Sequence, residues 1–199
     1  DSAQQLRAPT ILHDSVVIAI DEQSIAQLGR WPWSRQEHAK LINVLAESDA
    51  KAIYLDVLFA DQSTKISDDA LAAAMKKHGQ VALPMSIEPL GYQEQLVEVV
   101  PAAPFYAAAA AIGHAHVNCD FDGVCRSLYL REGIGQPQWL HLSAAFWPSD
   151  KPLTGRRANS MIAASPLLIY RDHHNFIPFS PNDRVPIVSY VDVLDGHIP

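Results

Sequence analysis

Apolar and polar positions follow two alternating patterns along the first two thirds of the chain. Residues 16–20 (VVIAI) form a continuous apolar run rich in β-branched side chains, typical of a strand buried on both faces of a parallel sheet. From Ser34 onward, the S-x-x-E pattern of a helix start precedes apolar residues at three- and four-residue spacing, which predicts an amphipathic helix. Residues 52–59 return to a strand pattern. The order predicted here is strand, helix, strand.

The same alternation continues downstream. Ser67 is placed to cap a helix with acidic residues in its first turn and lysines in its last, ending at Gly79. Asp122 and Gly123 form a turn signal between two strand patterns, which predicts a hairpin. The remaining predictions are a strand at 81–87, a polar excursion at 91–100, a short helix at 104–112, strands at 114–118 and 124–131, a helix at 139–147, a loop at 149–159, a strand at 167–170 and a helix at 189–194.

This alternation predicts the α/β class. We expect a mostly parallel sheet with helices on both faces, joined by right-handed crossovers, plus a β-hairpin. The sequence has no internal repeat and no low-complexity linker, so residues 1–199 are predicted to form a single domain.

Composition narrows the possible partners. The chain of 199 residues has 48% hydrophobic and 19% charged residues, which is ordinary for a globular protein. Its net charge is −7, and its basic residues form no run longer than a pair such as Arg156 with Arg157, so nucleic acid is not an expected partner. No apolar run approaches the roughly 18 residues that span a bilayer, and the first residues do not resemble a signal peptide.

The familiar enzyme signatures are missing from the sequence. Gly133 and Gly135 come nearest to a phosphate-binding loop, but a third glycine and a preceding parallel strand are lacking. No serine stands in a G-x-S-x-G elbow, and neither C-x-x-C nor H-E-x-x-H occurs. We therefore predict no catalytic residues and no cofactor.

Two histidines form a possible metal site. His114 and His116 lie two residues apart on a predicted strand, so that their rings share one face, and Asp120 or Asp122 is a possible third ligand for zinc. The alternative is one packed and one exposed histidine, which we favour over the metal site.

The hairpin turn also has the first half of a calcium loop, N-x-D-x-D-G, starting at Asn118. The acid expected at the twelfth position is Tyr129, so a turn rich in Asp and Asn is favoured. Cys119 and Cys125 bracket this turn and can close a disulfide if the two strands oppose them. Two small buried thiols remain the alternative.

Several blocks of the sequence together resemble one family. The most specific is GRWPWSR at 29–35, which follows VIAIDEQSI at 17–25. Further blocks are AIYLDVLF at 52–59, DDAL at 68–71, VALP at 81–84, GH at 113–114, DGV at 122–124 and VSYVDVLDG at 188–196. The chain thus resembles the CHASE family of the second type, the extracellular sensory domains associated with cyclases and histidine kinases.

The resemblance implies a place and a role. It implies a periplasmic domain of a bacterial receptor, anchored through neighbouring membrane helices and attached to a cytoplasmic output domain that carries the enzymatic activity. The domain itself is then a sensor without catalytic activity, and its stimulus is an unknown small molecule or physical cue. A metal-assisted hydrolase using His114, His116 and Asp122, and a module that binds a periplasmic protein, are the alternatives.

The sequence suggests where a ligand would bind. Ligands of open α/β sheets bind beyond the carboxyl ends of the parallel strands. Four polar residues fall at or near such ends: Asp21, Asp56, Ser86 and Asn118. The loop after the first strand adds two aromatic faces and a cation: Trp31, Trp33 and Arg35.

Each of these residues also has a structural interpretation, which we favour. Trp33 can staple the helix start by packing on His38, and Asp21 and Asp56 can cap local turns. In the functional interpretation, the stimulus stabilises one of two packings of the domain, and pairing of two copies as a homodimer transmits the difference.

Overall fold

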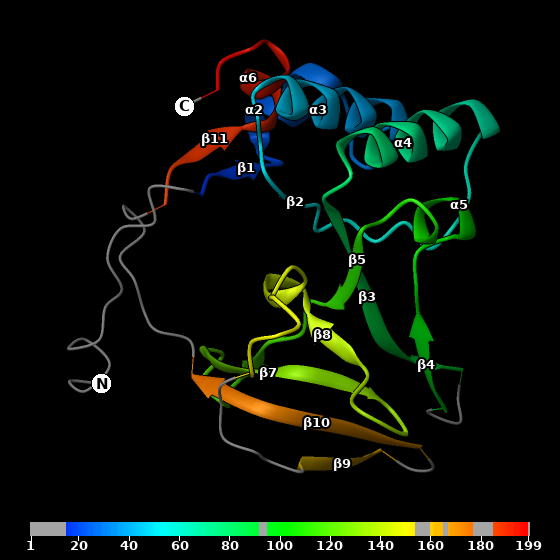
Figure 1. The fold of residues 1–199 in the computed structure, drawn as a ribbon, viewed down its shortest axis with the longest axis vertical. Helices are drawn as coiled ribbons and strands as arrows, with labels where there is room; N and C mark the ends of the chain where they lie inside the picture. The colour runs from blue at the N-terminus through cyan, green and yellow to red at the C-terminus, as the bar shows by residue number, and fades with distance from the viewer. Residues whose placement is uncertain (1–14, 92–94, 154–159, 165–166, 177–184, 199) are drawn as a thin grey trace. The chain divides into compact units, whose positions relative to one another are not determined.

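The computed structural model describes residues 15–91, 95–153, 160–164, 167–176 and 185–198. These residues form two compact units (Figure 1). The helical unit contains residues 15–51, Ser63–His78 and 185–198; the sheet unit contains Ala52–Gln62 and the described residues from 79 to 176. The prediction of a single domain stays a prediction.

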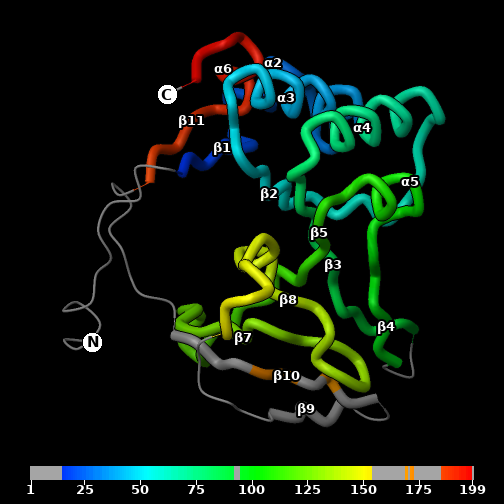
Figure 2. The backbone as a smooth tube through the Cα atoms, viewed as in Figure 1, coloured from blue at the N-terminus to red at the C-terminus, as the bar shows by residue number. Residues whose placement is uncertain are grey.

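The helical unit is built around a two-stranded parallel sheet. Strand β1 (Val17–Ala19) pairs with β11 (Ile187–Ser189), near the other end of the chain. Figure 2 shows this pairing as the blue and red segments lying side by side. The predicted placement of the first strand in a common sheet is therefore wrong. So is its predicted burial on both faces, because Val17 is 47% exposed.

Four helices complete the helical unit: α2 (Glu22–Leu28), α3 (Arg35–Glu47), α4 (Lys65–His78) and α6 (Tyr190–Leu194). Helix α3 confirms the predicted start, because Ser34 is its N-cap and its hydroxyl accepts a hydrogen bond from the Gln36 amide at 3.3 Å. The predicted cap at Ser67 is wrong. Helix α4 begins at Lys65, and the Thr64 hydroxyl accepts from the Ser67 amide at 3.4 Å.

The sheet unit holds the main sheet. Its strand order is β2-β3-β5-β8-β7-β10-β9, with β4 also paired to β3 and β6 to β7 (Figure 1). The strands are β2 (Ile53–Tyr54), β3 (Val81–Leu90), β4 (Gln95–Val99), β5 (Ala111–His114), β6 (Asn118–Cys119), β7 (Cys125–Ile134), β8 (Trp139–His141), β9 (Ser160–Ala164) and β10 (Leu167–Phe176).

The predicted α/β class is confirmed. Strands β2, β3, β5 and β8 are parallel neighbours, whereas β7, β10 and β9 extend the sheet with antiparallel pairings. The predicted hairpin is present as β6 and β7, with Gly123 at its turn in a left-handed conformation, φ 78°. The polar excursion expected at 91–100 contains a strand, β4.

Two helix predictions in this unit are wrong in part or in whole. Of the helix predicted at 104–112, only residues 104–106 are helical, within α5 (Ala103–Tyr106), because residues from Ala111 onward join the sheet as β5. The predicted helix at 139–147 is instead strand β8, followed by a single 3₁₀ turn, Leu142–Ala144. The His141 side chain ends the strand by accepting a hydrogen bond from the Ser143 amide at 3.2 Å.

The core of the sheet unit contains apolar side chains from β3, from α5 and from the segment that follows β2. Val81, Ala82 and Leu83 of β3 are fully buried, and Phe105 of α5 is buried against Phe59 with ring centroids 5.3 Å apart. Among the residues that the structure describes, no helix has the length and apolar character needed to cross a membrane. The predicted loop at 149–159 lies partly outside the described residues, as do Arg156 and Arg157.

Candidate functional site

A cavity of about 300 Å³ opens in the sheet unit. Its walls come from four strands and the segment that follows β5, and they contain both apolar and ionisable side chains. The register of β3 and β5 sets Met85, in the middle of β3, opposite His114 at the end of β5. The lining residues are Met85, Ser86, Ile87, His114, Ala115, His116, Glu132 and Ile169.

A buried carboxylate lies in the wall of the cavity. Glu132 of β7 is 2% exposed, and it stands opposite Arg171 of β10, which is 6% exposed. The Arg171 Nε atom is 2.8 Å from Glu132 Oε1. A buried charge is costly unless it is paired, so the guanidinium is what allows a carboxylate at this position.

His116 contacts both members of this pair through one ring nitrogen. Its Nδ1 atom lies 3.1 Å from Glu132 Oε2 and 3.0 Å from Arg171 Nη2. A ring nitrogen that carries a proton donates to the carboxylate, whereas one without a proton accepts from the guanidinium. The two contacts exclude each other, so the proton on His116 decides which of them is a hydrogen bond.

His114 is the second imidazole at the cavity. It is 1% exposed, and neither of its ring nitrogens has a hydrogen-bond partner among the described residues. Its Nδ1 atom is 3.8 Å from Glu132 Oε2, and its ring meets that of His141 edge-to-face at 5.0 Å. Burial lowers the pKa of His114 to about 4, so the ring is neutral at pH 7 and offers one donor and one acceptor.

The same neighbours set the charge of Glu132. Burial alone would raise its pKa, but the hydrogen bond from His116 and the charges of His114 and Arg171 hold that pKa below its ordinary value. Burial also lowers the pKa of His141. Near pH 7 the site therefore contains an ionised carboxylate, a guanidinium and buried neutral imidazoles.

The family model described as CHASE2 domain matches residues 1–199. The chain belongs to the CHASE2 domain family. This family comprises extracellular sensory domains found in receptors, and its role is sensory rather than catalytic. No curated protein and no solved structure matches the chain. The resemblance found in the sequence blocks is thus confirmed over residues 1–199.

Three of the candidate ligand-binding residues lie in the sheet unit of this CHASE2 domain. Ser86 lines the cavity, and its hydroxyl donates to Glu88 at 2.7 Å. The Asn118 side-chain oxygen accepts from Arg171 Nη1 at 3.4 Å, so it supports the ion pair. Asp56 is exposed. The structure thus places Ser86 at the cavity wall and Asn118 in contact with Arg171, the partner of the lining residue Glu132.

The other four candidates lie in the helical unit. Asp21 caps helix α2, where its carboxylate accepts from the Ser24 amide at 2.9 Å and from the Ser189 hydroxyl at 2.9 Å. Hydrogen bonds from Ser24 are the main reason that the pKa of Asp21 lies below its ordinary value. Arg35 lies 3.8 Å from the Asp68 carboxylate.

The tryptophans pack inside the same unit. Trp33 is buried against Tyr190, with ring centroids 4.8 Å apart, and its indole N–H donates to the Gly29 carbonyl at 2.8 Å. Trp31 meets the ring of His38 edge-to-face, with ring centroids 5.6 Å apart. These contacts give each residue a structural role, and a ligand-binding role for Asp21, Trp31, Trp33 and Arg35 stays a prediction.

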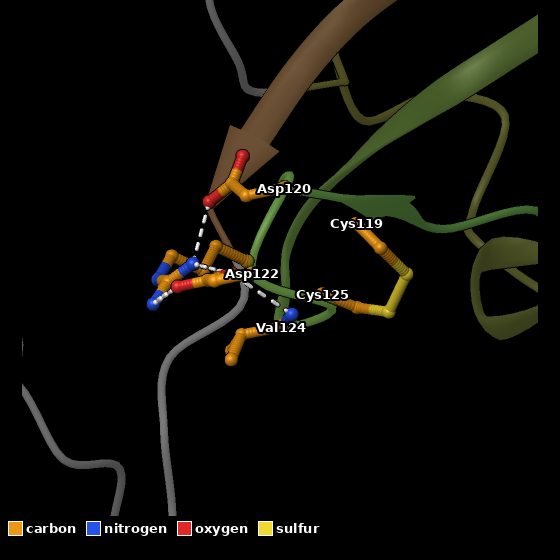
Figure 3. The surroundings of a disulfide bond; sticks show 6 residues. Cys119, Asp120, Asp122, Val124 and Cys125 are labelled. Carbon is orange, nitrogen blue, oxygen red and sulfur yellow. Dashed lines mark hydrogen bonds and ion pairs between the residues drawn. A yellow bond between two sulfur atoms is a disulfide. The ribbon is translucent and has the colours of Figure 1, made fainter.

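The hairpin turn carries no candidate metal site. Asp122 is bound by the Arg126 guanidinium, with Oδ2 2.8 Å from Nη2, and Asp120 contacts the same guanidinium (Figure 3). The hydrogen bond from Arg126 lowers the pKa of Asp122 to about 2. Within the described ranges, no group of three His, Cys, Asp or Glu residues is arranged to hold a metal ion. Among these described residues Asp122 therefore does not join His114 and His116 in such a group, and the hydrolase alternative stays a prediction.

Both cysteines of the sequence form a disulfide at the base of this turn. Cys119 of β6 stands directly opposite Cys125 of β7, and their sulfur atoms are bonded (Figure 3). The bond closes a loop whose ends are six positions apart.

The sequence interpretation missed Glu132, Arg171 and His141. Glu132 and Arg171 come immediately after the strands predicted at 124–131 and 167–170, so the local pattern did not indicate that these charged residues are buried in a sheet. Pairing Glu132 with Arg171 requires the register between β7 and β10, which places these two residues directly opposite each other. No local pattern contains that register.

Proposed function

We propose that this CHASE2 domain is the signal-input domain of a bacterial transmembrane receptor and lies on the periplasmic side of the inner membrane. Its output would be a cytoplasmic enzyme such as a histidine kinase, a diguanylate cyclase or an adenylate cyclase. The observation that carries the proposal is the cavity with its buried Glu132 and Arg171 pair in a domain of a sensory family. Buried ionisable groups gathered at a cavity are typical of functional sites.

The disulfide supports the periplasmic location. Cys119 and Cys125 form a bond of the kind that persists in oxidising compartments and is rare in the bacterial cytoplasm. The acidic net charge of −7 is compatible with this location and offers nothing to nucleic acid.

The cavity also supplies a two-state element for signalling. His116 Nδ1 can bond either Glu132 or Arg171 but not both, so an event that fixes the proton or displaces the ring selects one of two arrangements. We propose that the stimulus selects one of them, and that pairing of two copies passes the difference to membrane helices.

The gene and the topology of its product provide the test. The proposal expects membrane helices and a kinase or cyclase domain in the same reading frame as this domain. Alkaline phosphatase fused after the domain should be active, because that enzyme folds only outside the cytoplasm. A reading frame without any membrane helix, or an inactive fusion, contradicts the proposal.

The output of the full-length receptor tests the role of the cavity. His116→Gln keeps a hydrogen-bonding side chain but cannot carry the imidazole proton, so it should shift the balance of active and inactive receptor. His197→Gln, on an exposed histidine of the helical unit, is the matched control. Equal output from both variants and from the unmodified receptor would remove the cavity from the proposed function.

A further inference from the structure

The part of the cavity wall that carries no ionisable side chain is largely apolar. Met85, Ile87 and Ile169 contribute aliphatic and thioether surface, and Ala115 adds a methyl group at an exposed position. The volume of about 300 Å³ holds about ten water molecules at the ~30 Å³ that each takes in the liquid. A space of this size and lining suits a small organic molecule that buries apolar surface.

The buried imidazole is a second and independent feature. His114 lines the cavity and is 1% exposed, yet both of its ring nitrogens lack hydrogen-bond partners among the described residues. Buried polar atoms are nearly always paired, so an unpartnered imidazole in a cavity wall has the character of a ligand contact. The neutral ring can donate to or accept from one polar group of a ligand.

The charges of the site disfavour binding of a charged ligand. Glu132 and Arg171 are paired at 2.8 Å, and their charges cancel. An anionic ligand would meet the carboxylate that faces the cavity, and a cationic ligand would be desolvated beside a guanidinium that already neutralises that carboxylate. An uncharged ligand meets neither cost.

We propose that this cavity binds a small, uncharged, mostly apolar molecule that carries one alcohol, phenol or amide group, and that this group hydrogen-bonds to His114. The inference rests on the proposed function, because it names the chemical class of the stimulus for the same cavity. It concerns binding to the domain alone, whereas the proposed function is tested by the reading frame, the topology and the receptor output, so each can fail without the other.

Four probes that share one ring separate the contributions. Benzyl alcohol has the proposed chemistry, toluene lacks the polar group, benzoate is an anion, and benzylamine is a cation at pH 8. At that pH the buried imidazoles of His114 and His141 are uncharged, because burial lowers the pKa of each. The methyl resonance of Met85, a cavity residue that is 2% exposed, reports binding in an NMR titration of the domain.

The expected order of affinity follows from the contacts. Benzyl alcohol should shift the Met85 resonance with saturation, and it should bind roughly 3- to 10-fold more tightly than toluene, as one hydrogen bond between neutral groups allows. Benzoate and benzylamine should bind at least about tenfold more weakly than the alcohol, because their charges are desolvated without a free partner.

Two variants and one control locate the site. Ala115→Leu fills the cavity from an exposed position and should weaken both benzyl alcohol and toluene, whereas Ala110→Leu, at an exposed alanine outside the lining, should weaken neither. His114→Phe should weaken only the alcohol. If His114→Phe does not fold, the ratio of alcohol to toluene affinity in the unmodified domain carries this part of the test.

Other results overturn the proposal. These are no shift of Met85 with benzyl alcohol, equal affinity for a charged probe and the alcohol, an unchanged affinity in Ala115→Leu, or equal losses of toluene and alcohol affinity in His114→Phe.

Discussion

Arg171 and Glu132 face each other from neighbouring antiparallel strands, with Nε 2.8 Å from Oε1 and side chains only 6% and 3% exposed. A pair buried this deeply is retained at a cost, since two ions leave water to form one contact. The pair is held by further polar neighbours, because Asn118 accepts from the guanidinium and His116 faces both partners. Glu132 lines the cavity, so the charge of the cavity wall depends on this pair.

Removing one member of this pair should destabilise the domain strongly. Glu132→Gln leaves the Arg171 guanidinium buried without a counter-charge, so we expect the free energy of unfolding to fall by about 3 kcal/mol. Urea denaturation followed by circular dichroism measures the loss.

Two further variants separate this effect from a general one. Replacing both members, Glu132→Leu with Arg171→Met, should cost less than Glu132→Gln alone, because no charge is left unpaired. Lys40→Ala breaks an exposed ion pair with Glu37 on helix α3 and should change stability by less than about 0.5 kcal/mol. A double variant less stable than Glu132→Gln would show that the pair contributes through packing rather than charge.

Stability should fall as the pH is lowered below neutrality. Burial lowers the pKa of His38 and that of His114 from 6.5 to about 4. Between these values an unfolded histidine binds a proton and the buried one does not, so the unfolded state gains protons and unfolding becomes more favourable. Each histidine should lower the free energy of unfolding by about 3 kcal/mol across this window. A difference of one pKa unit between the folded and unfolded states corresponds to about 1.36 kcal/mol.

A series of urea titrations from pH 7.5 to 4 checks this pH dependence. His38 lies in the helical unit and His114 in the sheet unit, so His114→Phe should reduce the slope and leave the contributions of His38 and of His141, whose pKa burial also lowers. Stability that is constant between pH 7 and 4.5 would show that both rings are solvated enough to titrate normally.

Local signals of the sequence predicted local structure well. The S-x-x-E pattern at Ser34 identified the start of α3, and the Asp-Gly turn identified the hairpin of β6 and β7. Such patterns work because the groups that satisfy each other lie within a few residues along the chain.

The errors arose where distant residues decide the outcome. The apolar run at 16–20 was expected in the main sheet, but its partner is β11, about 170 residues later. Residues 139–141 were predicted to begin a helix, yet they form strand β8 and pair with β5 and β7. The cavity depends on the same long-range pairing, because Ser86 and His114 were found from the sequence while Glu132 and Arg171 needed the register of β7 and β10.

The hydroxyl of Tyr190 should stabilise the helical unit through one buried contact. It lies 3.0 Å from His38 Nδ1, and Tyr190 is 1% exposed. Burial raises the pKa of Tyr190, so the phenol stays protonated and can donate. Tyr190→Phe removes this hydrogen bond without a change of shape and should cost about 1 kcal/mol. Tyr106→Phe, at a half-exposed tyrosine, is the matched control and should cost less; equal losses would contradict the assignment.

Gly113 allows two segments of the sheet unit to approach closely. A Cβ atom at this position would lie 2.5 Å from the Leu140 carbonyl oxygen and 3.0 Å from the Leu142 amide nitrogen, both of them backbone atoms. Gly113→Ala should therefore push β5 away from β8 and cost about 1–3 kcal/mol. Because His114 is the next residue, the same variant should weaken benzyl alcohol binding if the proposed site is correct. Wild-type stability in Gly113→Ala would show that this approach is not tight in solution.

The disulfide between Cys119 and Cys125 should stabilise the sheet unit modestly, because it closes only a short loop. The entropy that a cross-link removes from the unfolded chain grows with loop length, and for this separation it corresponds to about 2 kcal/mol. Replacing both cysteines by serine should lower the free energy of unfolding by about that amount, and adding a reductant to the unmodified domain should have the same effect. The reductant should not change the stability of the double variant, which makes that variant its own control.

The Arg126 contacts with Asp120 and Asp122 hold the turn independently of the disulfide, so the hairpin should persist in the variant and its amide resonances should stay dispersed. A loss of these resonances on reduction would show instead that the bond, and not the ion pairs, forms the turn.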